Sequence, residues 1–88
     1  MPSDICTITN TRPTIKAGSS GAAVKQAQCY LNNSLTGDKL LVDGVFGPVT
    51  GAAVRRFQGC ADIIVDGVCG AQTWSHLAFW ANSPEFAC

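Results

Sequence analysis

The side chains that could act in catalysis are few and scattered along this chain. It contains one histidine, His76, and one glutamate, Glu85. Nucleophilic catalysis needs a base within hydrogen-bond reach of a serine or cysteine, and the sequence groups no such set. Asp43 and Asp66 hold equivalent positions, but each precedes a glycine, and an Asp-Gly pair already has a turn-forming role. We therefore predict no catalytic residue and no independent enzymatic activity.

Cysteine and histidine could also hold a metal ion, but their spacing argues against it. Structural zinc sites usually contain closely spaced C-x-x-C pairs, which are absent here. Cys60, Cys69 and His76 are suitable in type, yet their spacing matches no usual zinc pattern. The glycines near residue 20 also lack the GK[ST] ending of a phosphate-binding loop. We predict neither a metal site nor a cofactor.

Five cysteines in 88 residues favour an oxidising compartment, where small domains use disulfides to supplement a small core. An odd number leaves at least one cysteine free or paired outside the chain. Several pairings are open from the sequence alone. We expect Cys6 and Cys88 to bridge the two chain ends, and Cys29 and Cys60 to bridge the first two helices. Cys69 is then the expected free thiol.

Composition limits the function classes further. The length allows one small domain, and 47% hydrophobic with 14% charged residues is typical of a folded globular chain. The formal net charge is zero, so no basic field would attract nucleic acid or an anionic membrane. No apolar run approaches the length of a membrane span, and the first residues do not resemble a signal peptide. We expect an excised module or a mature domain.

A nine-residue phrase that occurs twice organises the chain. Residues 42–50 read VDGVFGPVT and residues 65–73 read VDGVCGAQT, with six of nine positions identical. Asp-Gly favours a turn, the second glycine stands where a helix N-cap would be, and proline suits the first helical position. The residue before each cap, Phe46 or Cys69, is placed to pack on the fourth helical residue. Each phrase therefore predicts a turn that leads into a helix and fixes its entry angle.

Three helices are predicted from these phrases and from the apolar periodicity. The GSSG turn at residues 18–21 offers Ser20 as the N-cap of the first helix. The stretch GAAVRRFQ in the second helix echoes GAAVKQAQ in the first at five of eight positions. The predicted helices cover residues 21–32, 48–60 and 71–81.

The expected fold is all-α: a small three-helix bundle with two loop-helix repeats, stapled by disulfides. Each repeat is too small to bury its own apolar face, so the helices must pack on one another. Residues 1–88 form a single domain in this interpretation. Its parts are an irregular N-terminal arm over residues 1–13, a core over residues 14–81 and a tail over residues 82–88.

Between residues 14 and 78 these features form a recognisable pattern. The doubled DGxxG phrase, the segment KAGSSGAAV and the pair Thr73-Trp74 resemble the three-helix peptidoglycan-binding domain found beside bacterial cell-wall hydrolases. The cysteine-bearing flanks are similar to the version fused to zinc D-alanyl-D-alanine peptidases, where a bridge joins the two ends of the module. Cys69 and Ala71 depart from the family pattern, in which an aliphatic residue and a proline are usual.

The resemblance implies a non-catalytic module that anchors an attached hydrolase to peptidoglycan. It implies a secreted, cell-wall-associated monomer, with a fused catalytic domain in the full-length protein. An alternative is a prodomain-like or protein-interaction module on the same fold, as in metallopeptidase prodomains that silence zinc with an exposed cysteine. The Pro-Arg-Cys-Gly motif of those prodomains is absent here.

The resemblance also suggests which side chains would contact the wall polymer. Glycan strands are usually recognised by exposed aromatic faces and planar polar groups, and muramyl peptides by donors to carboxylates. Arginine suits bidentate carboxylate contact. Core packing is the alternative role for the tryptophans, and a solvated face for the arginines. The candidate binding residues are Tyr30, Asn32, Arg55, Arg56, Gln72, Trp74 and Trp80.

Overall fold

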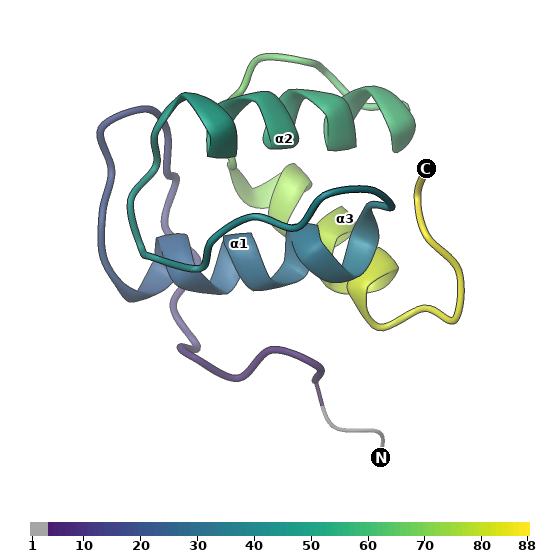
Figure 1. The fold of residues 1–88 in the computed structure, drawn as a ribbon, viewed down its shortest axis with the longest axis horizontal. Helices are drawn as coiled ribbons and strands as arrows, with labels where there is room; N and C mark the ends of the chain where they lie inside the picture. The colour runs from purple at the N-terminus through teal and green to yellow at the C-terminus, as the bar shows by residue number, and fades with distance from the viewer. Residues whose placement is uncertain (1–3) are drawn as a thin grey trace.

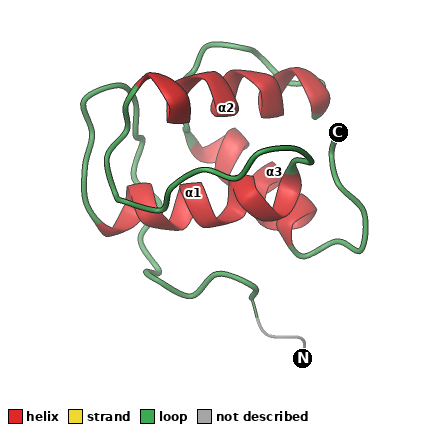
Figure 2. Ribbon diagram, viewed as in Figure 1, coloured by secondary structure: helices red, strands yellow, loops and turns green. Residues whose placement is uncertain are grey.

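The computed structural model describes residues 4–88, so the first three residues of the predicted arm lie outside the described part. Its helices are α1 (Ala22–Ser34), α2 (Pro48–Cys60) and α3 (Ala71–Ala81). In Figure 1, α1 lies against both other helices, and both packing contacts are present in the structure. Figure 2 shows loops and turns between them and no strand within residues 4–88. The predicted all-α three-helix bundle is confirmed.

The repeated phrase produces the helix starts that the sequence predicts. Gly47 and Gly70 are the N-caps of α2 and α3, both with extended backbone, and Pro48 is the first residue of α2. The preceding turn glycines, Gly44 and Gly67, have φ angles of 78° and 73°, which favour glycine because it has no Cβ. Both helices therefore begin and end at the predicted residues.

The start of α1 differs from the prediction. Its N-cap is Gly21, with φ 117° and no side-chain capping bond, and the helix begins at Ala22. Ser20 instead pairs with Val45 in an isolated antiparallel bridge, so its backbone is committed to the loop before α2. The prediction of Ser20 as N-cap was wrong because this bridge, rather than local capping, sets the path of the chain.

The segment before α1 joins the two repeats to each other. Ile15 exchanges two backbone hydrogen bonds with Cys69, with N···O distances of 3.2 and 2.8 Å. Four residues on, the Phe46 amide donates to the Ser19 carbonyl and the Gly18 amide donates to the Phe46 carbonyl. Both phrases are thus hydrogen-bonded to one short segment, residues 15–19, which includes a turn closed by the Ser19 amide and the Lys16 carbonyl. This segment sets α2 and α3 relative to α1.

Two equivalent pairs of positions in the repeats hold a large and a small residue in opposite order. Phe46 and Cys69 are equivalent and both are buried, as predicted. The Phe46 ring lies 3.6 Å from where a Cβ on Gly51, the fourth residue of α2, would be. In the second repeat the fourth helical residue is the buried Trp74, and the residue before the cap is the small Cys69. A large residue therefore accompanies a small one in each copy, which keeps the packed volume similar.

The disulfide pairing corrects the prediction. Cys6 bonds to Cys29 and Cys60 bonds to Cys88, so the predicted pairs Cys6–Cys88 and Cys29–Cys60 were wrong. The four bridged cysteines were identified correctly, and Cys69 is free and buried, as expected. Each bridge ties a non-helical end segment to a helix instead of tying the ends to each other.

The paths of the two end segments explain this pairing. The arm crosses α1, where the Gln26 amide nitrogen donates to the Cys6 carbonyl at 2.6 Å and the Gln26 amide oxygen accepts from Ile8. The tail folds back onto the end of α1, where the Ala87 amide donates to the Ser34 carbonyl at 2.7 Å. Cys6 therefore meets α1, and the residue after Ala87 is brought beside the end of α2.

Candidate functional site

Buried glutamines position the loops that form the molecular surface. The Gln28 amide nitrogen, on α1, lies 3.0 Å from Asp43 Oδ1 and 3.1 Å from the Val45 carbonyl oxygen. It also lies 3.1 Å from Thr50 Oγ1 in the first turn of α2, while the Gln28 amide oxygen accepts from the Gly44 amide at 2.9 Å. One side chain on α1 thus holds the Asp-Gly turn and the beginning of the next helix.

The second repeat uses the same arrangement. The Gln58 amide nitrogen, on α2, lies 2.8 Å from Asp66 Oδ1, 3.0 Å from the Val68 carbonyl oxygen and 3.1 Å from Thr73 Oγ1. The Gln58 amide oxygen accepts from the Gly67 amide at 3.0 Å. Both glutamine side chains are fully buried, and the hydrogen bonds offset the cost of removing their amides from water.

These contacts also lower the pKa of the two turn aspartates. The Val45 backbone N–H, and after it the Gln28 side chain, lower the pKa of Asp43 by stabilising its ionised form. The Val68 N–H and Gln58 lower the pKa of Asp66 in the same way. Asp66 also has Arg55 as a nearby positive charge, whereas no positive side chain contributes at Asp43. The equivalent carboxylates therefore differ in their charged surroundings.

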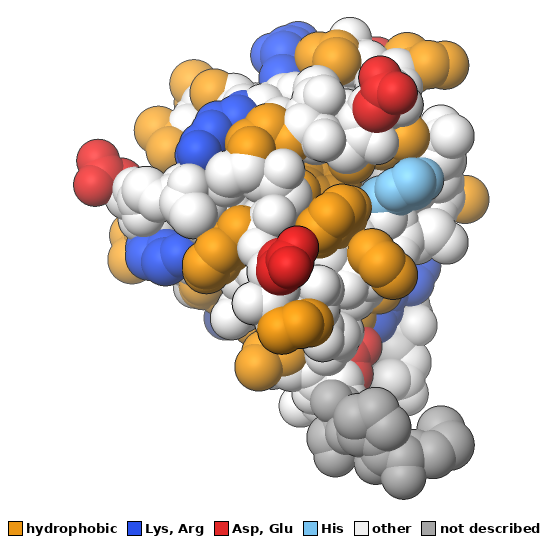
Figure 3. All heavy atoms as spheres, turned by 90° about the vertical axis from the view of Figure 1, so that its right-hand side faces the viewer, with side chains coloured by type: hydrophobic (Ala, Val, Ile, Leu, Met, Phe, Trp, Pro, Cys, Tyr) orange, Lys and Arg blue, Asp and Glu red, His pale blue; other side chains and the backbone are white. Residues whose placement is uncertain are grey.

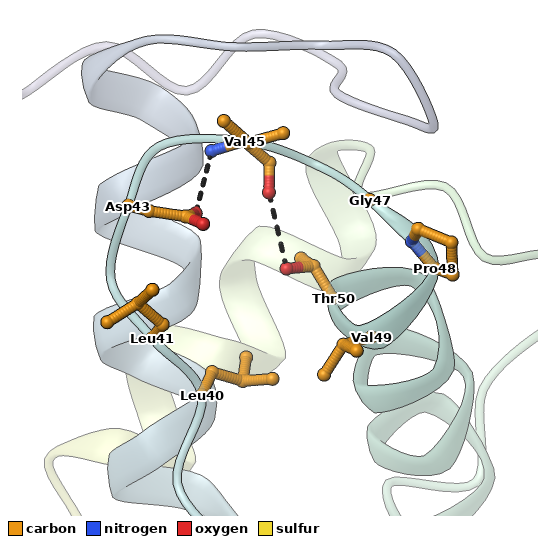
Figure 4. Close-up of a pocket in the computed structure, with 8 residues that line it drawn as sticks. All are labelled: Leu40, Leu41, Asp43, Val45, Gly47, Pro48, Val49 and Thr50. Carbon is orange, nitrogen blue, oxygen red and sulfur yellow. Dashed lines mark hydrogen bonds between the residues drawn. The ribbon is translucent and has the colours of Figure 1, made fainter.

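Two hollows on the surface are candidates for ligand binding. The first, which we call the α2 groove, has a volume of about 290 Å³ and lies between the preceding loop and the first turn of α2. Figure 4 shows Leu40 and Val49 pointing toward one another across it, while the Asp43 carboxylate projects toward Thr50. The lining residues are Leu40, Leu41, Asp43, Val45, Gly47, Pro48, Val49 and Thr50.

The second hollow, which we call the α3 aromatic surface, has a volume of about 430 Å³ and is lined by Ala61, Ser75, His76, Phe79 and Trp80. The Phe79 and Trp80 rings meet edge to face, with centroids 5.3 Å apart. Phe79 is 65% exposed, and together with Trp80 it presents aromatic surface at this hollow. In Figure 3 hydrophobic side chains gather around the pale-blue histidine on this face.

The structure does not bring the seven predicted binding residues together. Trp80 lines the α3 aromatic surface. Tyr30 and Trp74 instead pack edge to face in the core, and Tyr30 is 0% exposed. The Arg12 guanidinium lies 5.6 and 5.3 Å from their two ring centroids, and Trp74 donates to the Pro13 carbonyl. Tyr30 is thus enclosed by the protein, whereas Trp74 and Arg12 also line a third hollow of about 320 Å³ with Ala71, Ser75 and Ala78.

The remaining polar candidates are dispersed. Asn32 holds the loop by exchanging two hydrogen bonds with the Leu40 backbone, at 3.0 and 2.7 Å. Arg56 donates to the Thr36 carbonyl. Arg55 covers the Gly67 turn, with its guanidinium carbon 2.8 Å from the position of a Cβ there, and Gln72 is exposed in the first turn of α3.

The binding residues predicted from the sequence did not include Phe79, His76 or the residues that line the α2 groove. The sequence prediction also missed the structural role of the buried glutamines, although a signal was present. Gln28 and Gln58 end the two eight-residue stretches that echo each other, and both lie on otherwise largely apolar helix faces. A polar residue repeated on a buried face indicates a paired buried partner.

Within residues 4–88, no three side chains of the metal-ligating types are grouped as a metal site. None of the helices there has the length and apolar content needed to cross a membrane. Burial raises the pKa of the Cys69 thiol from its ordinary 9.0 to about 12, so the thiol is neutral at physiological pH.

The chain is similar to proteins associated with the bacterial cell wall. The family model described as "Putative peptidoglycan binding domain" matches residues 20–77. An uncharacterized protein from Kitasatospora aureofaciens is 43% identical over 82 residues, which cover 92% of this chain and 70% of that protein. The zinc D-Ala-D-Ala carboxypeptidase of Streptomyces albus G is 43% identical over 65 residues, covering 73% of this chain but 26% of the enzyme.

A solved structure gives the same picture. The fused Zn-dependent amidase/peptidase/peptidoglycan-binding domain-containing protein from Clostridium acetobutylicum matches with a TM-score of 0.71 and 37% identity. The match covers 88% of this chain and 33% of that chain. The chain therefore spans a minor part of these two larger proteins.

Proposed function

This chain belongs to the family of peptidoglycan-binding domains, and on that premise we propose that it is a non-catalytic module that holds an attached hydrolase against the cell wall. The carboxypeptidase and the fused amidase/peptidase support this role, because in both a similar segment accompanies a larger enzyme. Tethering raises the effective concentration of the enzyme at its polymer, so a weak single-site affinity is sufficient. The proposal includes secretion and a monomeric state.

The observation that carries the proposal is the α3 aromatic surface, which would contact the glycan strand. Exposed aromatic rings offer a flat apolar face to the C–H groups of a sugar, and the edge-to-face contact holds Phe79 and Trp80 in a fixed relation. Ser75 and His76 stand beside them as polar groups that could pair with sugar hydroxyls. An apolar hollow with a few polar groups is the usual form of a ligand site.

Retention on insoluble peptidoglycan tests this function. We expect the chain to sediment with the polymer, and Phe79→Ala to weaken retention by about threefold to tenfold through loss of ring contact. Phe86→Ala is the matched control, because Phe86 is also exposed but lies outside the lining of the α3 aromatic surface. Equal retention on cellulose or chitin, or an unchanged Phe79→Ala variant, would contradict the proposal.

A prodomain-like role has less support. It would need an accessible cysteine, whereas Cys69 is buried and its thiol has a pKa of about 12. The non-catalytic part of the proposal has its own test, which is a turbidity assay on suspended cell walls with this chain alone. We expect no clearing, and clearing above the level of a buffer control would show catalytic activity.

A further inference from the structure

We propose that the α2 groove binds the side-chain ammonium of the diamino acid in a peptidoglycan stem peptide. The module would then contact the peptide as well as the sugar strand. This inference rests on the proposed function, because it names a second part of the same polymer and assigns it to a second surface. The ligand chemistry is a primary ammonium on a short alkyl chain.

The walls of the groove suit the alkyl chain. Leu41 and Val49 are 77% and 71% exposed, yet they stand on opposite sides of the same hollow. Leu40 and Pro48 complete an apolar lining on the loop and on the helix. Exposed aliphatic side chains grouped around a hollow typically mark a binding surface, and methylene groups of a ligand would remove them from water.

A fixed carboxylate at the rim suits the ammonium. Asp43 Oδ1 accepts hydrogen bonds from the Val45 amide and from the Gln28 side chain, both at 3.0 Å. These bonds use one carboxylate oxygen and hold the group in place, which leaves Oδ2 to accept from a ligand. An ordinary aspartate is already ionised at physiological pH, and the same bonds lower the pKa of Asp43 further. Little ordering is then needed when the ligand binds.

No positively charged side chain contributes to the lowered pKa of Asp43, although the alkyl stem of Lys25 packs beside the adjacent Gly44. Lys39, on the same loop, donates instead to the carbonyls at the end of α1, those of Asn32 and Leu35, at 2.7 and 3.2 Å. The hydrogen bonds at Asp43 account for its lowered pKa without a contribution from any positive side chain. The N-terminal end of α2 adds about half a positive charge, which does not neutralise a full negative charge. An external cation would complete the site.

The second repeat differs from the α2 groove in its charge and on its helix side. Asp66 occupies the same turn and makes the same hydrogen bonds, but Arg55 lies near enough to lower its pKa further. The residues equivalent to Pro48 and Val49 are Ala71 and the polar, exposed Gln72. The loop residues equivalent to Leu40 and Leu41 are Ile63 and the exposed Ile64, so the second repeat keeps an aliphatic loop side and differs in its charge and on its helix side.

A titration of the isotope-labelled 88-residue chain with a synthetic stem tetrapeptide tests the inference by chemical-shift mapping. The peptide carries lysine at the diamino-acid position, and its Nε-acetylated form is the second arm. We expect the lysine peptide to shift the amides of residues 40–50, and acetylation to raise the Kd about threefold to fivefold. Asp43→Asn keeps an oxygen acceptor for the turn but removes the charge, and should raise the Kd by a similar factor.

Two further variants separate charge from shape and from folding. Asp66→Asn changes the equivalent turn in the same way and should leave the Kd unchanged. Val49→Ser does not touch the turn hydrogen bonds, and should weaken the lysine peptide and the acetylated peptide alike. Equal affinity for both peptides, or an Asp43→Asn variant as tight as the unmodified chain, would overturn the inference.

The outcome also distinguishes this inference from the proposed function. Retention of the unmodified chain on insoluble peptidoglycan, combined with no shifts at residues 40–50 on adding the tetrapeptide, would overturn the peptide site and leave the proposed function standing. If the unmodified chain is not retained on insoluble peptidoglycan, the proposed function is overturned, and the inference that rests on it is overturned too.

Discussion

At the scale of single residues, the buried glutamines explain why two loops of different length end in the same turn. Gln28 reaches a partner 15 positions away, Asp43, whereas Gln58 reaches Asp66 only 8 positions away. The Asp-Gly turn was predictable because it is local. The glutamine contacts were not, because no fixed sequence spacing links the partners and only the packed helices bring them together.

Replacing Gln58 with leucine should be strongly destabilising. The change leaves the Gly67 amide and Thr73 hydroxyl buried without their partner, and each lost buried bond costs about 1–3 kcal/mol. We expect the free energy of unfolding to fall by about 3 kcal/mol, measured by urea denaturation. Gln72→Leu, on the exposed side of α3, is the control. Equal effects of the two variants would contradict this role of Gln58.

Cys69 should be unreactive while the chain is folded. A thiol reagent near neutral pH should detect no free thiol in the native chain and one per chain in denaturant. The folded-state pKa lies above the unfolded value, so the stability that comes from the protonated thiol is complete below pH 9 and is lost as the pH rises toward 12. The Cys69→Ala variant has no thiol to ionise, so this part of the loss of stability at alkaline pH should be absent from it. Rapid labelling of the native chain would show that the thiol is accessible.

At the scale of elements, the repeated phrase allowed the starts of α2 and α3 to be predicted, because caps and turns depend on adjacent residues. The way in which the two phrases pack was harder to predict from the sequence. That Gly51 leaves room for the Phe46 ring follows from a contact that the sequence of one repeat does not reveal. The seven candidate binding residues stay a prediction, and Trp80 is the one among them that lines the proposed glycan surface.

Alanine at Gly44 should distort the first repeat. Its Cβ would lie 3.2 Å from the Gly21 carbonyl oxygen, a backbone atom that cannot rotate away, and φ is 78°. Gly18→Ala is the matched control, because φ is 94° there but no atom lies within 4 Å. We expect Gly18→Ala to cost about 1 kcal/mol from backbone strain and Gly44→Ala about 2–3 kcal/mol. Equal melting temperatures of the two variants, followed by circular dichroism, would argue against the close approach.

At the scale of the whole molecule, the non-helical ends are integrated with the bundle. Tyr30 donates to the Asp4 carboxylate, and the Asn82 side chain accepts from the Ile5 amide. The arm therefore contacts both α1 and the end of α3. The division into an arm, a core over residues 14–81 and a tail stays a prediction. The disulfide pairing could not be predicted because it depends on the direction in which each end folds back.

The bridge between Cys60 and Cys88 should contribute substantially to stability. It closes a loop with a sequence separation of 28, and the chain-entropy model gives about 3–4 kcal/mol for loops of this size. We expect the double variant Cys60→Ala/Cys88→Ala to lose that amount, measured by guanidinium denaturation. Cys69→Ala retains both bridges and serves as the control. A loss no larger than that of the control would indicate that the tail is held by its hydrogen bonds alone.

The same bridge anchors Cys88 to the end of α2. The backbone returns from α3 to α2, and Figure 1 places the C-terminal mark beside the end of α2. A polypeptide joined after Cys88 would therefore leave from a covalently anchored point on the bundle. The radius that a tethered enzyme could sweep would be set by its linker alone, roughly 5–6 Å times the square root of the number of linker residues if the linker is flexible.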